Sequence, residues 1–430
     1  MIEEGPRTRS VALVGDDTPW LRPAFHVDVG DRVELGQVLV TDRSRPELRL
    51  ASPASGAIKS IERTEMRRLA ALVIEVKGEG ERRFRAFAAD ELVQLPGAEV
   101  ATHLLEAGHW IALRTRPFGN VADASAPPDA LFVRAMDTNP LAARAGLVIA
   151  ERPDDLRFGL IGLSRLTEGP VFFCTELGAP PIAGLGLPGV VEEQVRVVAF
   201  EGPHPAGLPG THIHHLLPRR AGRRAWYVGY QDVLAIGHQL RTGRWSPERV
   251  IALGGPRVRR PRLLRTRLGA STEDLVRGEL ESPESRIISG SVLSGRLAAS
   301  RGSYLGRYHE QVCVIPGGPS PRRGRWPVPA GRRTRWVPPW LGRPEWTGDL
   351  HGSKRAMLPI HGFERVVPLR LHVSMLLRAL AVGDSEEALR LGALELEEED
   401  LALCTYLCPS KLEYGSLLRT ALRELEKRQP

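Results

Sequence analysis

The sequence predicts a multidomain α/β protein in which a small β domain, an α/β layer domain, a compact mixed module and a helical domain follow one another. Three patterns predict this order. Apolar residues alternate around glycines near the N-terminus, helical patterns and short apolar runs alternate from about Pro96, and apolar residues recur every three or four positions after Pro368. A length of 430 residues suits two to four domains, each large enough to bury a core.

Residues 1–92 are expected to form the β domain. Apolar residues alternate around glycine turns in HVDVGDRVELGQVLVTD, from His26 to Asp42, and ASPASGAIKSIE, from Ala51 to Glu62, repeats the pattern. Two such hairpin-like units resemble the barrel-sandwich fold of biotinyl and lipoyl carrier domains. Those carriers present a modifiable lysine between the two units, whereas TDRSRPELRL contains none. We therefore expect the fold without the swinging-arm chemistry.

Residues 93–245 are expected to form a Rossmann-like α/β domain with a mostly parallel sheet. The segment AEVATHLLEAGHWIAL, residues 98–113, has helical spacing. Short apolar runs are suited to buried strands, and they are ALFVRAM (130–136), FGLIGL (158–163), GPVFFC and VRVVAF.

Residues 246–315 predict a β-grasp module, in which a helix lies across a small sheet. A strand, a Gly-Gly turn and a second strand precede a short helix that Ser271 or Thr272 can cap. Glu273 and Asp274 suit the positive end of that helix. The run RIISGSVLSG then supplies a further strand.

Residues 316–353 break the pattern, because they are rich in Pro, Gly, Arg and Trp and show no period. They fit either a long surface connection or a contact with a partner or a membrane surface. The second interpretation comes from tryptophans beside arginines, which tolerate half-burial at such surfaces. These are Trp326, Trp336, Trp340 and Trp346.

Residues 354–430 are expected to be a small helical bundle.

Composition narrows the class of protein. No run approaches the 18 apolar residues of a membrane span, and the N-terminus lacks a signal-peptide pattern, so we expect a protein on the cytosolic side of any membrane it meets. The net charge of +8 is mostly arginine. Nucleic-acid motifs are absent from the sequence. The four scattered cysteines are expected to be reduced thiols.

A histidine-rich loop, EGPHPAGLPGTHIHHLLP, is the first candidate for chemistry. On a strand, His212 and His214 would share a face and could chelate a metal ion, with His204 closing the site from the loop. Against this, the loop has no nearby cysteine or acidic residue and no HEXXH motif. A metal site and a structural or ligand-contacting loop both stay open.

Cys404 and Cys408 are the second candidate, because an i, i+4 pair shares one face of a helix. The run CTYLCP resembles the last two cysteines of a bacterial ferredoxin motif. Upstream, where two more should stand, the chain reads LEEEDLAL. Two thiolates are too few for an iron–sulfur cluster.

Two further segments place polar groups where ligands bind. Arg114 and Arg116 follow a helix and could hold an anionic or carbonyl group, or could be solvated. Asp137 and Asn139 follow a predicted strand, where α/β sheets hold ligands, although both also favour turns. No glycine-rich nucleotide loop occurs in the sequence.

Unusual runs along nearly the whole chain resemble, in the same order, the family of the A subunit of the bacterial sodium-translocating NADH:quinone oxidoreductase. They are ALRTRPF, AMDTNPLAA, LIGLSRLTE, GPHPAGLPGTHIH, YQDVLAIG, ERVIALGG, PRLLRT, RIISGSVL, YLGRYH, RAMLPI, LELEEEDLALCTYLCP and LEYGSLLR. The family is similar in domain order to the C subunit of the Rnf complex and to the NADH- and FMN-binding subunit of complex I. The resemblance implies an SLBB-like β-grasp module and a degenerate ferredoxin motif.

The resemblance also implies a function. The family is a peripheral subunit on the cytoplasmic face of the bacterial inner membrane, in a complex that oxidises NADH, reduces ubiquinone and exports sodium. It implies no redox cofactor and no metal in this chain, with NADH, FAD, FMN and iron–sulfur clusters in partner subunits. The partners would be the other subunits, chiefly the membrane-embedded quinone- and FMN-binding subunit. This chain would contribute assembly, with quinone as a candidate ligand.

A bound quinone needs hydrogen-bond donors at its carbonyl oxygens and apolar side chains around its ring. The candidates for quinone or partner binding are Arg114, Arg116, Phe118, Asp137, Asn139, His204, His212 and His214. No catalytic residue is expected in this chain. Two alternatives remain: an electron-input subunit of an Rnf-like complex with its own cofactor, and a metallo-enzyme that uses the histidine loop.

Overall fold

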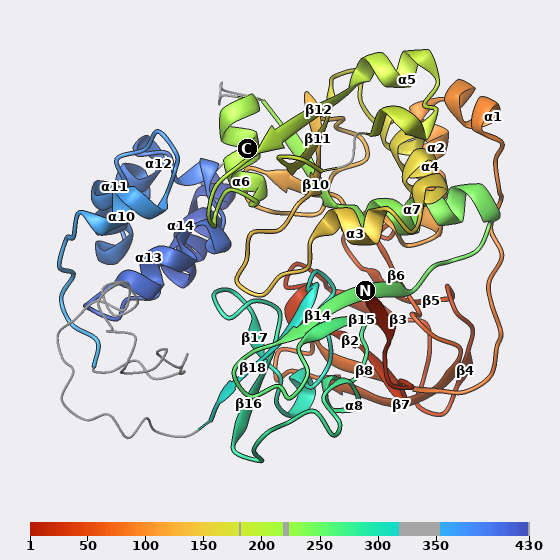
Figure 1. Cartoon of the computed structure of the whole chain (residues 1–430), viewed down its shortest axis with the longest axis horizontal. Coiled ribbons are helices and arrows are strands. Elements are labelled where there is room, and N and C mark those ends of the chain that lie inside the picture. The colour runs from red at the N-terminus through yellow and green to blue at the C-terminus, as the bar shows by residue number, and fades with distance from the viewer. Residues whose placement is uncertain (180–181, 218–222, 318–352, 429–430) are drawn as a thin grey trace.

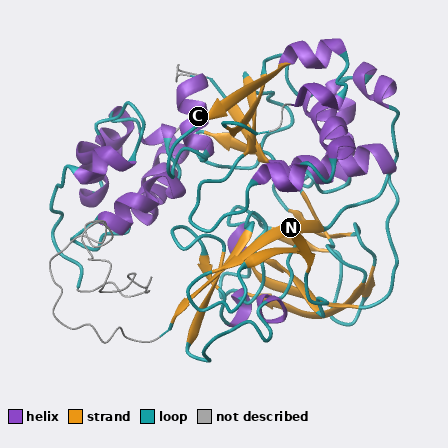
Figure 2. Ribbon diagram, viewed as in Figure 1, coloured by secondary structure: helices purple, strands orange, loops and turns teal. Residues whose placement is uncertain are grey.

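The computed structural model describes residues 1–179, 182–217, 223–317 and 353–428. Figure 1 shows a β-rich half that contains the N-terminus, an α/β unit above it and the C-terminal helices to one side. Figure 2 separates the same regions by secondary structure. Trp326, Trp336, Trp340 and Trp346 lie outside the described residues. No helix in the described ranges is long and apolar enough to cross a membrane.

The N-terminal region consists of two antiparallel sheets, and it confirms the predicted barrel-sandwich domain. Buried Leu39, Leu72 and Ile74 belong to its core. One sheet has the order β2-β8-β7-β4 and the other β3-β5-β6. The strands are β2 (Ser10–Val14), β3 (Pro23–Phe25), β4 (Arg32–Val33), β5 (Val38–Asp42), β6 (Arg49–Ala51), β7 (Gly56–Arg63) and β8 (Leu69–Val76).

The second unit has a five-stranded sheet with the order β12-β11-β10-β13-β9. Only β9 is antiparallel, so the predicted mostly parallel sheet is confirmed. The strands are β9 (Arg114–Arg116), β10 (Ala130–Ala135), β11 (Val171–Glu176), β12 (Val195–Phe200) and β13 (Ala225–Gly229). The helices are α1 (Ala89–Gln94), α2 (Gly97–Glu106), α3 (Ala145–Ile149), α4 (Pro153–Ser164), α5 (Gly189–Gln194), α6 (Pro209–Leu216) and α7 (Tyr230–Thr242).

One predicted strand of this unit is wrong. The run FGLIGL lies in helix α4, which is buried on nearly every face and packs against α7. A β-carbon on Gly159 would lie 2.4 Å from the carbonyl oxygen of Val233, so the glycine permits close helix packing. A continuously apolar run does not distinguish a buried helix from a buried strand. Pro153 at the first helical position was the available helix signal.

The third unit has a six-stranded sheet with the order β1-β15-β14-β18-β16-β17. Ser271 caps helix α8 (Thr272–Leu275) by accepting from the backbone N–H of Asp274, as predicted. Strand β1 (Ile2–Glu4), from the N-terminus, pairs in parallel with β15 (Arg262–Arg267), which the sequence pattern did not reveal. The other strands are β14 (Glu248–Gly254), β16 (Ser285–Ser289), β17 (Arg296–Leu297) and β18 (Gln311–Pro316).

The C-terminal region is a helical bundle, as predicted. Leu376, Leu418 and Leu422 are fully buried in its core. Its helices are α10 (Gly362–Val366), α11 (Val373–Val382), α12 (Ser385–Arg390), α13 (Ala402–Leu407) and α14 (Tyr414–Arg428), with a 3-10 turn, η7 (Glu398–Leu401), before α13.

Candidate functional site

Loops at the carboxyl edge of the five-stranded sheet carry Asp137, Asn139 and His204. In open α/β sheets this edge is where ligands bind. The loop after β10 meets the loop after β12, since Thr138 Oγ1 lies 3.3 Å from His204 Nδ1 and accepts from the N–H of Gly207 at 2.9 Å. Figure 1 places the C-terminal helices beside α6 at this end of the unit.

Asp137 and Asn139 form a turn at this edge. Asp137 Oδ1 accepts from the backbone N–H of Asn139 at 2.8 Å and from its side-chain amide at 2.9 Å. The other carboxylate oxygen of Asp137 pairs with Arg134 at 3.1 Å. Both side chains therefore have internal partners, as expected of turn formers.

The two histidines of the H-x-H motif lie on helix α6, so the prediction that they share a face of a strand is wrong. Residues two apart on a helix point in different directions. His212 is fully buried, Nε2 lies 2.9 Å from the carbonyl oxygen of Ala206, and burial lowers its pKa to about 4. It is thus a neutral histidine that donates to a backbone carbonyl.

His214 instead contacts the C-terminal bundle. Its Nε2 accepts from the backbone N–H of Arg370 at 3.0 Å, and its Nδ1 contacts the carboxylate of Glu395. Because Nε2 is an acceptor, Nδ1 carries the proton given to Glu395. Glu395, 181 residues further along the chain, is therefore an acidic partner of His214 that the sequence did not reveal. Within the described ranges, no three His, Cys, Asp or Glu side chains gather in a way that could hold a metal ion.

Arg114 and Arg116 lie on edge strand β9, opposite Tyr227 and Ala225 of β13. Arg116 is buried, and its Nη2 donates to Asp400 Oδ2 at 3.0 Å. Its Nε lies 3.5 Å from Glu397 Oε1. Arg114 donates to the carbonyl oxygen of Gly119 through Nη2 at 2.7 Å and through Nε at 3.1 Å. Both arginines thus hold groups of this chain.

The acidic run LEEED, residues 396–400, supplies the carboxylates that pair with side chains of β9 and β13. The hydroxyl of Tyr227 donates to both oxygens of Glu397, at 2.8 and 2.7 Å. Glu397 and Asp400 also form a capping box that holds the turn η7. Burial, together with the charges of Asp400 and Glu397, raises the pKa of Glu399 to about 7. The run therefore lies against strands β9 and β13 and pairs with Arg116 and Tyr227.

A further carboxyl group, Glu310, reaches Arg134 of β10 from the loop before β18. Its Oε2 lies 3.2 Å from Arg134 Nη2. Burial raises the pKa of Glu310 to about 7, although Arg134 opposes the shift. Neither Glu310 nor Tyr227 was predicted. Complementary charge between RTR and LEEED is the one signal that could have suggested the contact with the acidic run.

Phe118 does not face an open cavity. Its backbone has a positive φ of 76°, and its side chain is buried in the core of the C-terminal bundle. Its carbonyl oxygen accepts from Arg419 Nη1 at 2.7 Å. The residue therefore joins the α/β unit to the bundle.

Cys404 and Cys408 are buried in the bundle core, and both are free thiols. Helix α13 ends at Leu407, so Cys408 lies just beyond its last turn. Burial raises the pKa of Cys404 to about 12. An inert core thiol is the expected behaviour of such a group.

Three protein-family models match the chain. They are described as the NqrA N-terminal barrel-sandwich hybrid domain (residues 1–77), the NqrA second alpha/beta domain (95–245) and the NQRA C-terminal domain (250–300). Among solved structures, an NAD+-reducing [NiFe]-hydrogenase in the H2-reduced state is similar at 14% identity, over 80% of this chain and 64% of that chain, with a TM-score of 0.40.

Full-length relatives are much more similar. The A subunit of the Na(+)-translocating NADH-quinone reductase of Neisseria meningitidis serogroup C is 45% identical, over 99% of this chain and 96% of the relative. The protein of the same name from Hahella chejuensis is 43% identical, again over 99% and 96%. The one from Klebsiella pneumoniae is 45% identical over 99% and 95%. The chain belongs to the NqrA family, the A subunits of the Na(+)-translocating NADH-quinone reductases.

Proposed function

We propose that this chain is the assembly subunit of a sodium-translocating NADH:quinone reductase, peripheral on the cytoplasmic face of the membrane. In this proposal it binds partner subunits, and the partners carry NADH, FAD, FMN and the iron–sulfur clusters. One observation carries the assignment of a binding role. The chain's own acidic run covers strands β9 and β13, with Asp400 on Arg116 and Glu397 on Tyr227, so these side chains have partners within the chain instead of a ligand.

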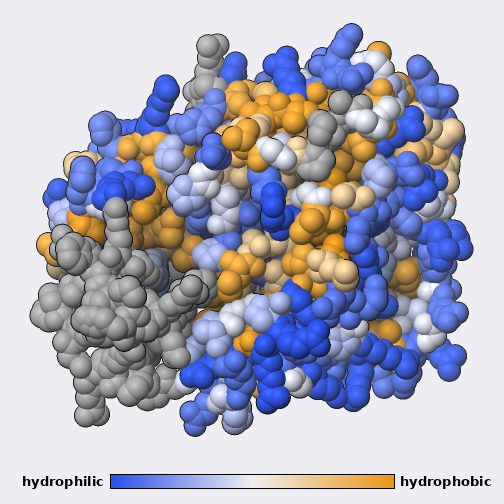
Figure 3. Space-filling model, in the orientation of Figure 1, coloured by the Kyte–Doolittle hydropathy of each residue, from blue (hydrophilic) through white to orange (hydrophobic). Residues whose placement is uncertain are grey.

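An exposed edge strand supports a docking role. Strand β12 ends the five-stranded sheet, and Val197 on it is 50% exposed. Leu177 and Val190, on the adjoining segments, are 62% and 65% exposed. Figure 3 shows hydrophobic side chains gathered in this region of the surface. Exposed apolar side chains beside an unpaired strand edge are typical of protein contacts, and we assign them to the membrane-embedded quinone- and FMN-binding subunit.

Co-purification from membranes tests the assignment. We expect the tagged chain to recover a sodium-dependent NADH:quinone reductase activity. Val197→Asp is expected to reduce recovery of the partners. Val29→Asp is the matched control, because Val29 is 62% exposed on the N-terminal domain. Full recovery with Val197→Asp contradicts the docking surface, and a stable free monomer that recovers no partner contradicts the assembly role.

Quinone binding is the second candidate, and one observation favours it. Arg116 Nη1 is buried and has no hydrogen-bond partner among the described residues. A quinone carbonyl oxygen is a hydrogen-bond acceptor that can pair with this N–H donor. Photolabelling of the whole complex with a photoreactive short-chain ubiquinone tests this. Label on residues 111–118 supports the candidate, whereas label confined to the other subunits contradicts it.

A further inference from the structure

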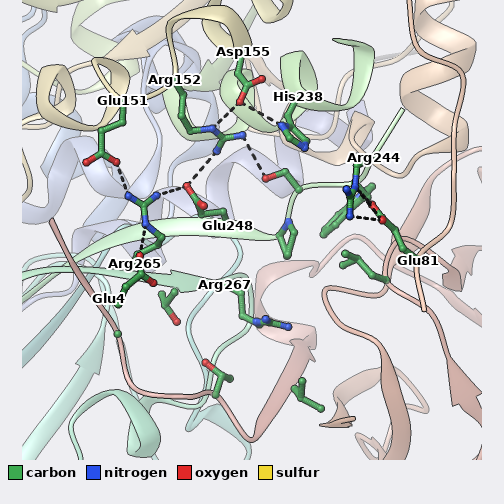
Figure 4. A pocket seen from close by; sticks show the side chains of 18 of the residues that line it. Glu4, Glu81, Glu151, Arg152, Asp155, His238, Arg244, Glu248, Arg265 and Arg267 are labelled. Carbon is green, nitrogen blue, oxygen red and sulfur yellow. Dashed lines mark hydrogen bonds and ion pairs between the residues drawn. The ribbon is translucent and has the colours of Figure 1, made fainter. Parts of the chain in front are cut away.

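A large cavity lies away from the carboxyl edge of the sheet, where the first three units meet. Its volume is about 1010 Å³. The segment Glu4–Thr8, the start of α4, helix α7 and strands β14 and β15 contribute to its walls. Figure 4 shows that charged side chains from these elements line it. The volume is at the upper end of the range for small-molecule sites.

Most of these charges are paired within the chain. Arg265 contacts Glu4 at 2.9 Å, Glu151 at 2.6 Å and Glu248 at 2.7 Å. The other pairs are Asp155 with Arg152, Arg241 and His238, Glu81 with Arg244, and Glu248 with Arg152. Figure 4 draws the contacts among the residues that it labels as dashed lines.

Arg267 differs from its neighbour Arg265 in its ion pairs. The two lie two residues apart on β15, so they share a face of the strand. Glu248 stands directly opposite Arg267 in the strand register, but its carboxylate contacts Arg265 and Arg152 instead. Figure 4 draws Arg267 with no dashed line, and no hydrogen bond or ion pair of its side chain occurs in the described part of the chain.

The environment of Arg267 favours an added anion. The residue is neither buried nor fully exposed, and burial lowers the pKa of its guanidinium. A partly desolvated guanidinium that has no counter-ion is stabilised when an anion binds beside it. Its planar fork matches the oxygens of a phosphate group, to which it can donate two parallel hydrogen bonds.

We propose that this cavity binds a small phosphate-bearing molecule, with Arg267 holding the phosphate oxygens. The cavity exceeds the size of a bare phosphate ion, so an organic group attached to the phosphate has room beside it. Such a ligand contacts walls from all three units, and so it stabilises their arrangement. This site is independent of the docking surface on β12 and of the contacts of Arg116.

Isothermal titration calorimetry and thermal unfolding of the full chain with inorganic pyrophosphate test the site. We expect saturable binding that weakens with added KCl and raises the unfolding temperature. Arg267→Gln is expected to weaken binding at least about tenfold, or about 1.4 kcal/mol. Arg267→Lys is expected to retain part of the affinity, because the charge stays while the fork is lost.

Arg286→Gln is the matched control, because Arg286 lies on β16 of the same sheet, is half-buried and does not line the cavity. It is expected to bind as the wild type does. The Arg267 variants are expected to fold, since no described side chain depends on this guanidinium, and circular dichroism checks this. No binding by the wild type at millimolar pyrophosphate overturns the proposal. Equal binding by wild type and Arg267→Gln overturns it too.

A second arm separates free ligands from lipid headgroups. Vesicles of phosphatidylcholine with and without phosphatidylglycerol are sedimented with the full chain. Competition by pyrophosphate for binding to the anionic vesicles assigns the site to a headgroup. Pyrophosphate binding with no Arg267-dependent sedimentation assigns it to a soluble phosphate ester. Both results keep Arg267 as the phosphate ligand.

Discussion

Nη2 of Arg116 donates to Oδ2 of Asp400 at 3.0 Å, although 284 residues separate them in the chain. The pair joins edge strand β9 of the parallel sheet to the turn η7 of the C-terminal bundle. Both side chains are almost fully buried. The contact therefore fixes the C-terminal bundle against the parallel sheet.

Removing the Asp400 carboxylate should lower the free energy of unfolding by more than removing a surface charge does. Asp400→Asn leaves the buried Arg116 with less compensation, and breaking a buried pair typically costs about 3–5 kcal/mol. Urea unfolding monitored by tryptophan fluorescence measures the change. Glu386→Gln is the control, because its pair with Arg428 is exposed and should contribute about 1 kcal/mol or less. Equal losses in the two variants would contradict the structural role of the buried pair.

Stability should fall as the pH rises through neutrality. Burial raises the pKa values of Glu310 and Glu399 to about 7, so the folded state binds protons more tightly than the unfolded state between about pH 4.5 and 7. Their contribution is therefore present at low pH and is lost as the pH rises through 7. Burial lowers the pKa of His109 to about 3, which opposes this trend only below about pH 6.5.

Unfolding at pH 6.5 and pH 8 measures this dependence. We expect a smaller free energy of unfolding at pH 8 in the wild type. Glu310→Gln should show a weaker decline, because the amide does not titrate. A decline that is unchanged by Glu310→Gln would exclude this residue as its source.

The packing of α4 against α7 should not tolerate a methyl group at Gly237. A β-carbon there would lie 1.7 Å from the carbonyl oxygen of Asp155. Gly237→Ala should therefore destabilise the protein by about 3 kcal/mol or more, as overpacking forces the helices apart. Gly189→Ala, at the start of α5 with open space around it, should change stability by about 0.5 kcal/mol or less. Thermal unfolding of both variants makes the comparison.

His212 should prove structural. His212→Ala removes a buried ring whose centroid lies 4.3 Å from that of Phe200 and whose Nε2 contacts the carbonyl oxygen of Ala206. We expect a loss of about 2–4 kcal/mol. His215→Ala is the control, because His215 is exposed on the same helix. Elemental analysis should show the same zinc content in both variants and the wild type, and loss of bound zinc on His212→Ala would restore the metal hypothesis.

Local patterns predicted many individual elements of the fold. Alternating and continuous apolar runs marked β10, β11 and β12, and Ser271 capped its helix as the residue type suggests. The helical spacing after Pro368 marked the C-terminal bundle. The domain boundaries proposed at residues 92, 245, 315 and 353 stay predictions.

The sequence by itself determined the family and the helices with one apolar and one polar face, and its continuous apolar runs marked the buried strands β10 and β11. It failed at FGLIGL, since a helix buried on all sides has no such contrast. Only the tertiary structure decided that β1 joins β15, that LEEED meets RTR and that Arg267 lacks the partner Arg265 has. Such pairings depend on which surfaces meet across hundreds of residues, and no local period encodes that choice.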